Sequence, residues 1–146
     1  VKEFNAVEHR IEFVREISGV KYYNDSKGTN PDAAIKAVEA MVSPTVVIGG
    51  GYDKQASYDE WIASFGDKVK CLVLLGATAD KIAASADKAG FTNIIKTDSL
   101  KEAVKAASLN AKPGDAVLLS PACASWDMFK SYEERGTLFK EYVNSL

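Results

Sequence analysis

Residues 45–51 read Thr-Val-Val-Ile-Gly-Gly-Gly, a short apolar run that ends in three glycines. The run lacks the polar alternation of a half-exposed strand, which is typical of a strand covered on both faces in a parallel sheet. Similar runs follow at residues 69–75 and 116–119, and a weaker one lies near residues 93–95. All are far shorter than the ~20 apolar residues that a membrane-spanning helix needs. The sequence therefore predicts a buried, mainly parallel sheet.

Helical patterns lie between these runs. Pro31 suits the first turn of a helix in which apolar residues recur at helical spacing. Ser57 with Glu60, and Ser99 with Glu102, have the spacing of capping boxes, which start helices. The expected helices cover residues 31–41, 57–65, 79–89, 99–110 and 128–144.

The start of the chain has a different pattern. Two β-rich runs at residues 11–17 and 20–24 are separated by Ser-Gly, which favours an antiparallel hairpin. Helices and buried strands then alternate, as they do in the α/β class. We expect one domain over residues 1–146, with a Rossmann-like α/β fold: an open, mainly parallel sheet flanked by helices and an N-terminal antiparallel hairpin.

Composition excludes several classes of function. The 146 residues carry 18 Lys and Arg against 20 Asp and Glu, a net charge of -2, so neither nucleic acid nor a membrane is an expected partner. His9 is the single histidine, and Cys71 and Cys123 lie far apart, which argues against zinc and against a Ser-His-Asp triad. No metal site is predicted. With no initiating Met and no signal peptide, we expect a piece of a longer protein.

Polar residues follow the second run of the hairpin. Residues 24–31 read Asn-Asp-Ser-Lys-Gly-Thr-Asn-Pro and lead into a helix start. Lys27, the hydroxyl of Thr29 and the free N–H groups of the helix would suit a phosphate or a carboxylate. Alternatively, Asn30 caps the helix and Asp25 only turns the chain. The local pattern favours the two interpretations equally.

A second strand end carries glycines. Residues 49–54 read Gly-Gly-Gly-Tyr-Asp-Lys, so a ligand could approach the backbone while Lys54 contacts an anion. A flexible turn between strand and helix is the alternative. The segment does not match a nucleotide-binding P-loop.

The last strand runs into small residues. Residues 118–127 read Leu-Leu-Ser-Pro-Ala-Cys-Ala-Ser-Trp-Asp. Cys123 lacks a basic neighbour in sequence, so we expect a packed small residue rather than a nucleophile. Trp126, Met128 and Phe129 open the terminal helix and are expected to anchor it in the core.

Taken together, these segments and residues 76–82 (Gly-Ala-Thr-Ala-Asp-Lys-Ile) resemble the carboxy-terminal domain of the Mur ligases. The likeness covers essentially the whole chain, and its first and last segments are most similar to the members that add D-glutamate. It implies a Mur ligase C-terminal domain over residues 1–146, from a bacterial cytoplasmic enzyme whose central ATPase domain and N-terminal UDP-binding domain are absent from this chain.

The resemblance implies an ATP-dependent amide ligase of peptidoglycan synthesis. In this family, ATP phosphorylates the carboxylate of UDP-MurNAc-L-alanine, and the amine of D-glutamate attacks the acyl phosphate to give an amide, ADP and phosphate. ATP with Mg²⁺ is held mainly by the central domain, which is the implied protein partner of this chain. We therefore expect the chain to be inactive as a complete catalyst when it is alone.

The resemblance also implies roles for residues. By position, Arg10 contacts the ATP phosphates, Asp25 lies near the nucleotide ribose, and Lys27 binds near the transferred phosphate as the catalytic lysine. The implied contacts to D-glutamate and its surroundings are Thr29, Lys54, Ser125, Trp126 and Tyr132.

Two alternatives stay open. A folylpolyglutamate synthase-like protein, or another Mur-type amide ligase, would use the same domain plan with a different acceptor. A nucleotide- or anion-binding module would bind without catalysis. Tight ATP binding by the isolated chain would favour the module.

Overall fold

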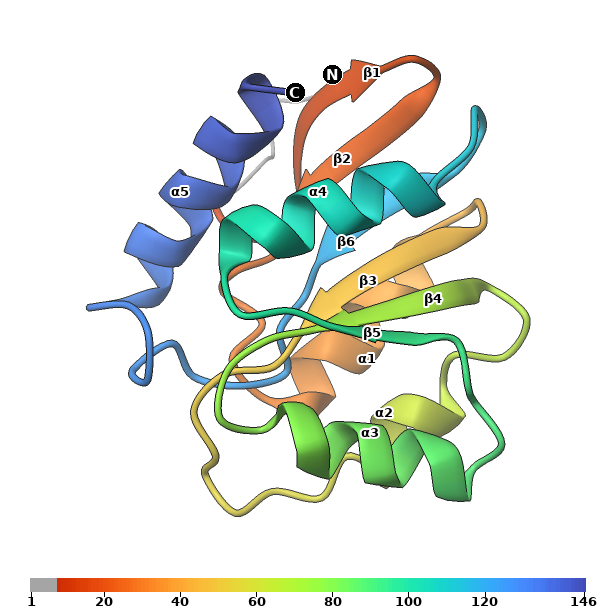
Figure 1. Cartoon of the computed structure of the whole chain (residues 1–146), viewed down its shortest axis with the longest axis vertical. Helices are drawn as coiled ribbons and strands as arrows, with labels where there is room; N and C mark the ends of the chain where they lie inside the picture. The colour runs from red at the N-terminus through yellow and green to blue at the C-terminus, as the bar shows by residue number, and fades with distance from the viewer. Residues whose placement is uncertain (1–7) are drawn as a thin grey trace.

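The structure, a computed structural model, describes residues 8–146 and begins with a hairpin (Figure 1). β1 (Glu12–Ile17) and β2 (Val20–Asn24) pair antiparallel. Ser18 and Gly19 form the turn with φ values of 52° and 81°. Positive φ at both central residues suits a two-residue hairpin, because it matches the twist of the strands. The predicted hairpin is confirmed.

The hairpin continues into a larger sheet. The other strands within residues 8–146 are β3 (Thr45–Gly49), β4 (Val69–Leu74), β5 (Ile94–Lys96) and β6 (Ala116–Leu119). The sheet order is β1-β2-β6-β3-β4-β5, and every neighbouring pair except β1 with β2 is parallel. All residues of β3 and β6 are buried, which is why their sequences show no alternation. The predicted mainly parallel α/β sheet is confirmed.

Helices cover both faces of this sheet (Figure 1). They are α1 (Pro31–Ala40), α2 (Asp59–Ala63), α3 (Ala79–Lys88), α4 (Leu100–Asn110) and α5 (Tyr132–Asn144). Val47 of β3 packs in one core with α1, α2 and α3, whereas Val46 and Ile48 pack in a second core with α4 and α5. Successive strand residues point to opposite faces, so one strand supplies both cores.

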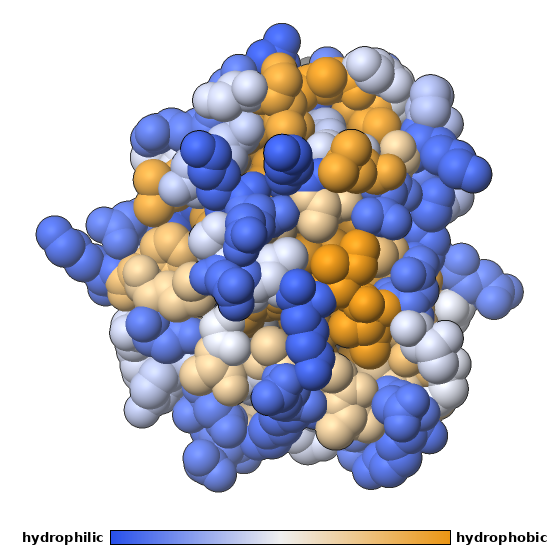
Figure 2. All heavy atoms as spheres, in the orientation of Figure 1, coloured by the Kyte–Doolittle hydropathy of each residue, from blue (hydrophilic) through white to orange (hydrophobic). Residues whose placement is uncertain are grey.

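Figure 2 shows the face on which α4 and α5 lie. Hydrophilic residues cover much of this face, and hydrophobic residues gather in separate patches between them. Within residues 8–146, every helix is too short or too polar to cross a bilayer.

Two capping predictions have different outcomes. The Ser99 hydroxyl oxygen accepts a hydrogen bond from the N–H of Glu102 at 3.1 Å, so the cap of α4 is confirmed. The capping box expected at Ser57 is wrong, because α2 begins at Asp59 and its N-cap, Tyr58, makes no capping bond through its side chain. Tyr58 is fully packed in the core. The Ser57 hydroxyl oxygen accepts only a long hydrogen bond of 3.4 Å from the N–H of Asp59, so the buried Tyr58 ring lies at the boundary of α2 without a capping box.

The terminal helix begins later than the expected residue 128. Ser131 is the N-cap of α5, and its hydroxyl oxygen accepts from the N–H of Glu134 at 3.1 Å. The carboxylate of Glu134 accepts from the N–H of Lys130 at 3.0 Å. The Ser131 cap, which was not predicted from the sequence, therefore sets the start of α5.

The segment before α5 also corrects a packing prediction. Trp126 and Met128 were expected in the core, but their exposed fractions are 64% and 38%. The carbonyl of Ser125 accepts from the N–H groups of Met128 and Phe129 at 3.2 and 2.8 Å, which folds residues 125–129 into a turn. Only Phe129 of the three packs against the core.

Candidate functional site

Three loops meet at the carboxyl edge of the sheet. They are residues 25–30 after β2, residues 50–58 after β3 and residues 120–131 after β6. Because β6 lies between β2 and β3, its loop reaches both of the others. In open parallel sheets, ligands bind outside this edge. The strand ends that the sequence singled out are thus brought together.

Backbone contacts fix the loops against one another. The N–H of Gly50 donates to the carbonyl of Pro121, and the N–H of Ala122 donates to the carbonyl of Gly28, both at 2.9 Å. Gly50 has φ 110°, and a Cβ at this position would collide with the carbonyl of Leu75. Only glycine therefore fits here.

A cavity of about 420 Å³ lies beside the N-terminus of α1, lined by Arg10, Asp25 and Lys27 among others. Within residues 8–146, the ammonium group of Lys27 has no hydrogen-bond or ion-pair partner. Asn30 caps α1, since its side-chain oxygen accepts from the N–H of Ala33 at 2.9 Å. The capping interpretation is therefore correct for Asn30, and it leaves Lys27 free to meet an anion.

Asp25 faces this cavity but is largely committed to the protein. Its side chain is almost fully buried; one oxygen accepts from the N–H of Ile11 at 3.1 Å and the other from the hydroxyl of Ser120 at 2.8 Å. Burial raises the pKa of Asp25 to about 6, against the lowering effect of these bonds and of the charges of Arg10 and Arg135. Asp25 mainly joins the residue before β1 to the end of β2 and to the loop after β6.

Lys54 and Trp126 are neighbours across two loops. The Lys54 ammonium lies 5.9 Å from the centre of the Trp126 ring, and the Tyr52 ring lies 5.5 Å from that ring. All three side chains are exposed. Ser125 beside them is buried, yet its hydroxyl has no hydrogen-bond partner within the described residues. A cation, a hydroxyl and an aromatic pair therefore share this part of the edge.

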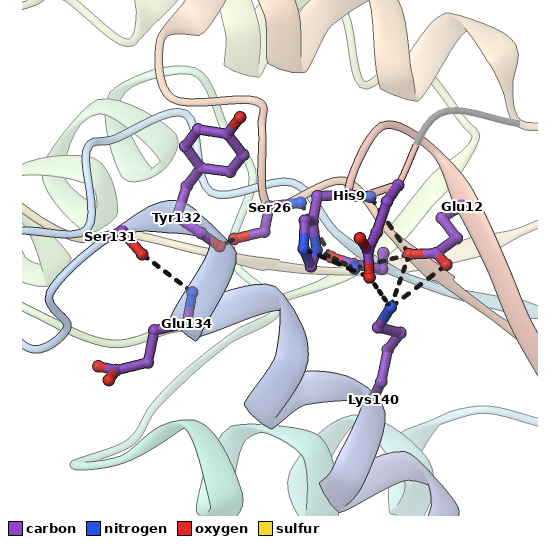
Figure 3. A network of polar contacts seen from close by, with 9 residues as sticks. His9, Glu12, Ser26, Ser131, Tyr132, Glu134 and Lys140 are labelled. Atoms are coloured by element: carbon purple, nitrogen blue, oxygen red, sulfur yellow. Dashed lines mark hydrogen bonds and ion pairs between the residues drawn. The ribbon is translucent and has the colours of Figure 1, made fainter.

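Tyr132 contacts the first loop from the start of α5 (Figure 3). Its carbonyl accepts from the hydroxyl of Ser26 at 2.7 Å, and its ring meets His9 edge-on at a centroid distance of 6.1 Å. His9 is buried and bonds to the side chain of Asn24 at 2.9 Å. Its carbonyl accepts from the N–H of Lys27 at 2.9 Å. The lone histidine is therefore structural.

Thr29 completes the set of expected contacts. It is half-buried at the end of the first loop, and its N–H donates to the carbonyl of Lys27 at 2.9 Å. Its hydroxyl has no hydrogen-bond partner in the part of the chain that the structure describes. Like Lys27 and Ser125, it therefore offers an unused polar group at the edge.

Arg135 has a role at this edge that was not predicted from the sequence. The side chain is buried, with a relative exposure of 2%. Its guanidinium bonds to Ser26 and Cys123 in two different loops. Burial lowers the pKa of Arg135 to about 10. A sequence signal existed: Arg135 is four residues before Phe139 and eight before Val143, so it lies on the inward face of α5.

One cluster has the residue types of a metal site. Glu8, His9 and Glu12 each offer a ligand atom, but Lys140 already places its ammonium 2.8 Å from Glu8 and 3.3 Å from Glu12 (Figure 3). A cation therefore already balances these carboxylates. The cluster stabilises the join between β1 and α5.

The sequence of the domain matches a known protein family. Residues 9–123 match the family described as "Mur ligase, glutamate ligase domain". The chain belongs to this Mur ligase domain family. The matched range covers two of the three edge loops in full, including Lys27 and Lys54, and the start of the third.

Sequence relatives agree with the assignment to the Mur ligase domain family, and solved structures share the fold of the chain. The chain is 60% identical over its whole length to UDP-N-acetylmuramoylalanine--D-glutamate ligase of Lachnospira eligens and 61% identical to that of Lachnoclostridium phytofermentans. It spans 32% of each of these proteins. The crystal structure of UDP-N-acetylmuramate-alanine ligase from Thermotoga maritima matches 97% of the chain with a TM-score of 0.66 and 14% identity, covering 31% of that protein. A bifunctional folylpolyglutamate synthase/dihydrofolate synthase from Yersinia pestis matches 95% with a TM-score of 0.67 and 18% identity, covering 32% of that protein. At such identities these two structures are evidence for the fold alone.

Proposed function

We propose that the chain is the C-terminal domain of a ligase that adds D-glutamate to UDP-MurNAc-L-alanine with ATP. In the proposed reaction the γ-phosphoryl group of ATP passes to the alanyl carboxylate, and the amine of D-glutamate then displaces phosphate to form the amide. The observation that carries the proposal is the identity of about 60% over the whole chain to ligases of that name. The central ATPase domain is the proposed partner.

The free polar groups at the sheet edge support this chemistry. D-glutamate carries two carboxylates, and we assign Lys54, Thr29 and Ser125 to them as one cation and two hydroxyl donors. We place Trp126 and Tyr132 beside the bound amino acid. The loop that carries Ser125 bonds to the loops that carry Thr29 and Lys54, so one ligand can contact all three loops.

The cavity at α1 supports a phosphate subsite. We assign Arg10 and Lys27 to the ATP phosphates, with Lys27 nearest to the transferred group. Acyl phosphate chemistry needs positioning and neutralisation of charge more than a protein nucleophile. Burial raises the pKa of the Cys123 thiol, so this cysteine remains protonated and packed. We propose a bacterial, cytoplasmic setting from the relatives.

The described residues suit the phosphates of ATP but do not form a site for Mg²⁺. The cations at the cavity suit phosphate, whereas both oxygens of Asp25 already accept hydrogen bonds. The carboxylates of Glu8 and Glu12 likewise already form ion pairs with Lys140. No divalent metal site is built from these residues, so we derive no step through Mg²⁺ in this domain.

The proposal is tested on the full-length protein. We expect ADP and phosphate release that requires both UDP-MurNAc-L-alanine and D-glutamate. Lys27→Ala and Lys54→Ala should each lower kcat/KM by about 100-fold while the protein stays folded. Lys105→Ala, on the exposed side of α4, is the matched control and should leave kcat/KM unchanged. Equal turnover with L-alanine or a diamino acid would contradict the substrate assignment.

The cavity also permits the simpler hypothesis of a nucleotide- or anion-binding module. Titration of the isolated chain with ATP separates the two. Tight binding by this domain alone would favour the module, because the proposed ligase holds ATP mainly in its central domain.

A further inference from the structure

Arg135 is a buried cation at the point where the predicted ligand loops meet. Its Nε donates to the hydroxyl oxygen of Ser26 at 2.9 Å, Nη2 donates to the Ser26 carbonyl at 2.8 Å, and Nη1 donates to the Cys123 carbonyl at 3.1 Å. Ser26 directly precedes Lys27, and Cys123 lies two residues before Ser125. One side chain therefore holds the backbone beside both groups of expected ligand contacts.

The same guanidinium also reaches the other two expected contact regions. The Ser26 hydroxyl, while accepting from Arg135, donates to the carbonyl of Tyr132 at 2.7 Å (Figure 3). A Cβ added at Gly51 would lie 3.4 Å from Nη1 of Arg135, so the glycine loop passes directly over it. Arg135 thus bonds to the first and third edge loops, borders the second, and is linked to the start of α5 through Ser26.

Among the residues that the structure describes, the charge of Arg135 has no direct counter-ion. Within residues 8–146, no carboxylate forms an ion pair with it, and its nearest acceptors are neutral carbonyl and hydroxyl oxygens. A buried charge of this kind is costly for stability unless its hydrogen bonds are complete. An apolar residue would fill the space at lower cost, so packing alone does not explain a guanidinium here.

We propose that Arg135 is a positioning residue for the ligand site: it holds the loops of Lys27 and Ser125 in one fixed arrangement. The expected effect on the KM for D-glutamate rests on the proposed function, whereas the hydrogen bonds of Arg135 do not. The planar fork is needed because three donors must reach two carbonyls and a hydroxyl at once, which a lysine ammonium cannot reproduce.

The first test compares variants of the full-length protein. Arg135→Lys keeps the charge, and Ser26→Ala removes the hydroxyl that links Arg135 to Tyr132. We expect each to raise the KM for D-glutamate by about tenfold, with a smaller change in KM for UDP-MurNAc-L-alanine, which we place outside this domain. Val143→Ala is the control, since Val143 is buried on the same helix away from the loops. It should lower Tm without this difference in KM.

The second test does not depend on activity. In the 146-residue chain, we follow amide hydrogen exchange at Gly28 and Ala122, whose N–H groups are bonded within and between the loops. Arg135→Lys and Ser26→Ala should accelerate exchange there by about tenfold, and Val143→Ala should not. If Arg135→Lys fails to fold, Ser26→Ala decides both tests.

The outcomes separate the two proposals. A wild-type protein without D-glutamate-dependent turnover would overturn the proposed function, while the exchange experiment would still judge the positioning. Unchanged exchange at Gly28 and Ala122, together with unchanged KM in the folded variants, would overturn the role of Arg135. The role would also be overturned if Val143→Ala raised the KM for D-glutamate and accelerated exchange as much as Arg135→Lys and Ser26→Ala do.

Discussion

At the scale of single residues, Asp25 links stability to pH. Burial places its folded pKa at about 6, above its ordinary value of 3.8. The folded state therefore prefers the protonated carboxyl, so the contribution of Asp25 to stability is complete below pH 4 and is lost as the pH rises through 6. Between these limits the change is on the order of 2 kcal/mol.

Asp25→Asn tests this pH dependence. The amide mimics the protonated carboxyl, since it can still accept from Ile11 and can donate to Ser120. We expect the variant to lose the part of the pH dependence that comes from Asp25 and to be the more stable protein at pH 7. Urea unfolding at pH 4.5 and 7 measures the difference. A variant that is less stable at pH 7 and has the same pH dependence as the parent would show that the carboxylate is stabilised by its bonds.

At the scale of secondary structure elements, Gly136 shows how packing opposes local preference. Gly136 lies inside α5, where alanine would ordinarily favour the helix by ~1 kcal/mol. A Cβ at this position would collide with Nδ1 of His9. Because that ring also bonds to Asn24, we expect Gly136→Ala to destabilise the chain by about 2 kcal/mol.

The matched control for this substitution is Thr137→Ala, at the next and exposed position of α5. It should be neutral or slightly stabilising, because alanine has the better helix propensity. Thermal unfolding of the two variants checks the sign. A stabilising Gly136→Ala would mean that His9 can move away without cost.

The helix caps provide another test at the same scale. Ser99→Ala should cost about 1 kcal/mol, because the hydroxyl oxygen caps α4. Ser57→Ala should change stability by less than ~0.5 kcal/mol, since Ser57 lies outside α2 and is exposed. The free energy of unfolding in urea compares them. Equal losses would indicate that Ser57 does cap a helix in solution.

At the scale of the whole molecule, the two cores meet at the central strands. β6, β3 and β4 are covered on both faces, whereas β1 and β5 form the edges and are only partly buried. We expect the slowest amide exchange in β3, β4 and β6, because their amides open only in global unfolding. Equally slow exchange in β5 would show that the edge unfolds together with the centre.

The same contrast explains what the sequence could predict of the fold. Unbroken apolar runs such as Thr45–Gly49 predicted buried parallel strands, because burial on both faces leaves a local mark in composition. The starts of α2 and α5 could not be predicted in this way. Tyr58 and Ser131 fix them through packing and a cap that compete with equally plausible signals nearby.

The candidate site was predictable in part for a similar reason. Lys27, Lys54 and Ser125 follow strand ends, so topology alone places them at one edge. Arg135 lies far along the chain in a helix, and only the folded structure shows its bonds to Ser26 and Cys123. Trp126 was expected in the core because its hydrophobicity is visible in the sequence, whereas the turn that exposes it is not.

The two tryptophans lie in opposite surroundings, so their intrinsic fluorescence can report on two parts of the chain separately. Trp61 is fully buried beneath Gly49, while Trp126 is exposed beside Lys54 and Tyr52. Iodide should quench the emission of Trp126 and leave that of Trp61, which would then report unfolding alone. Occupation of the sheet edge can accordingly be followed by fluorescence without an added label.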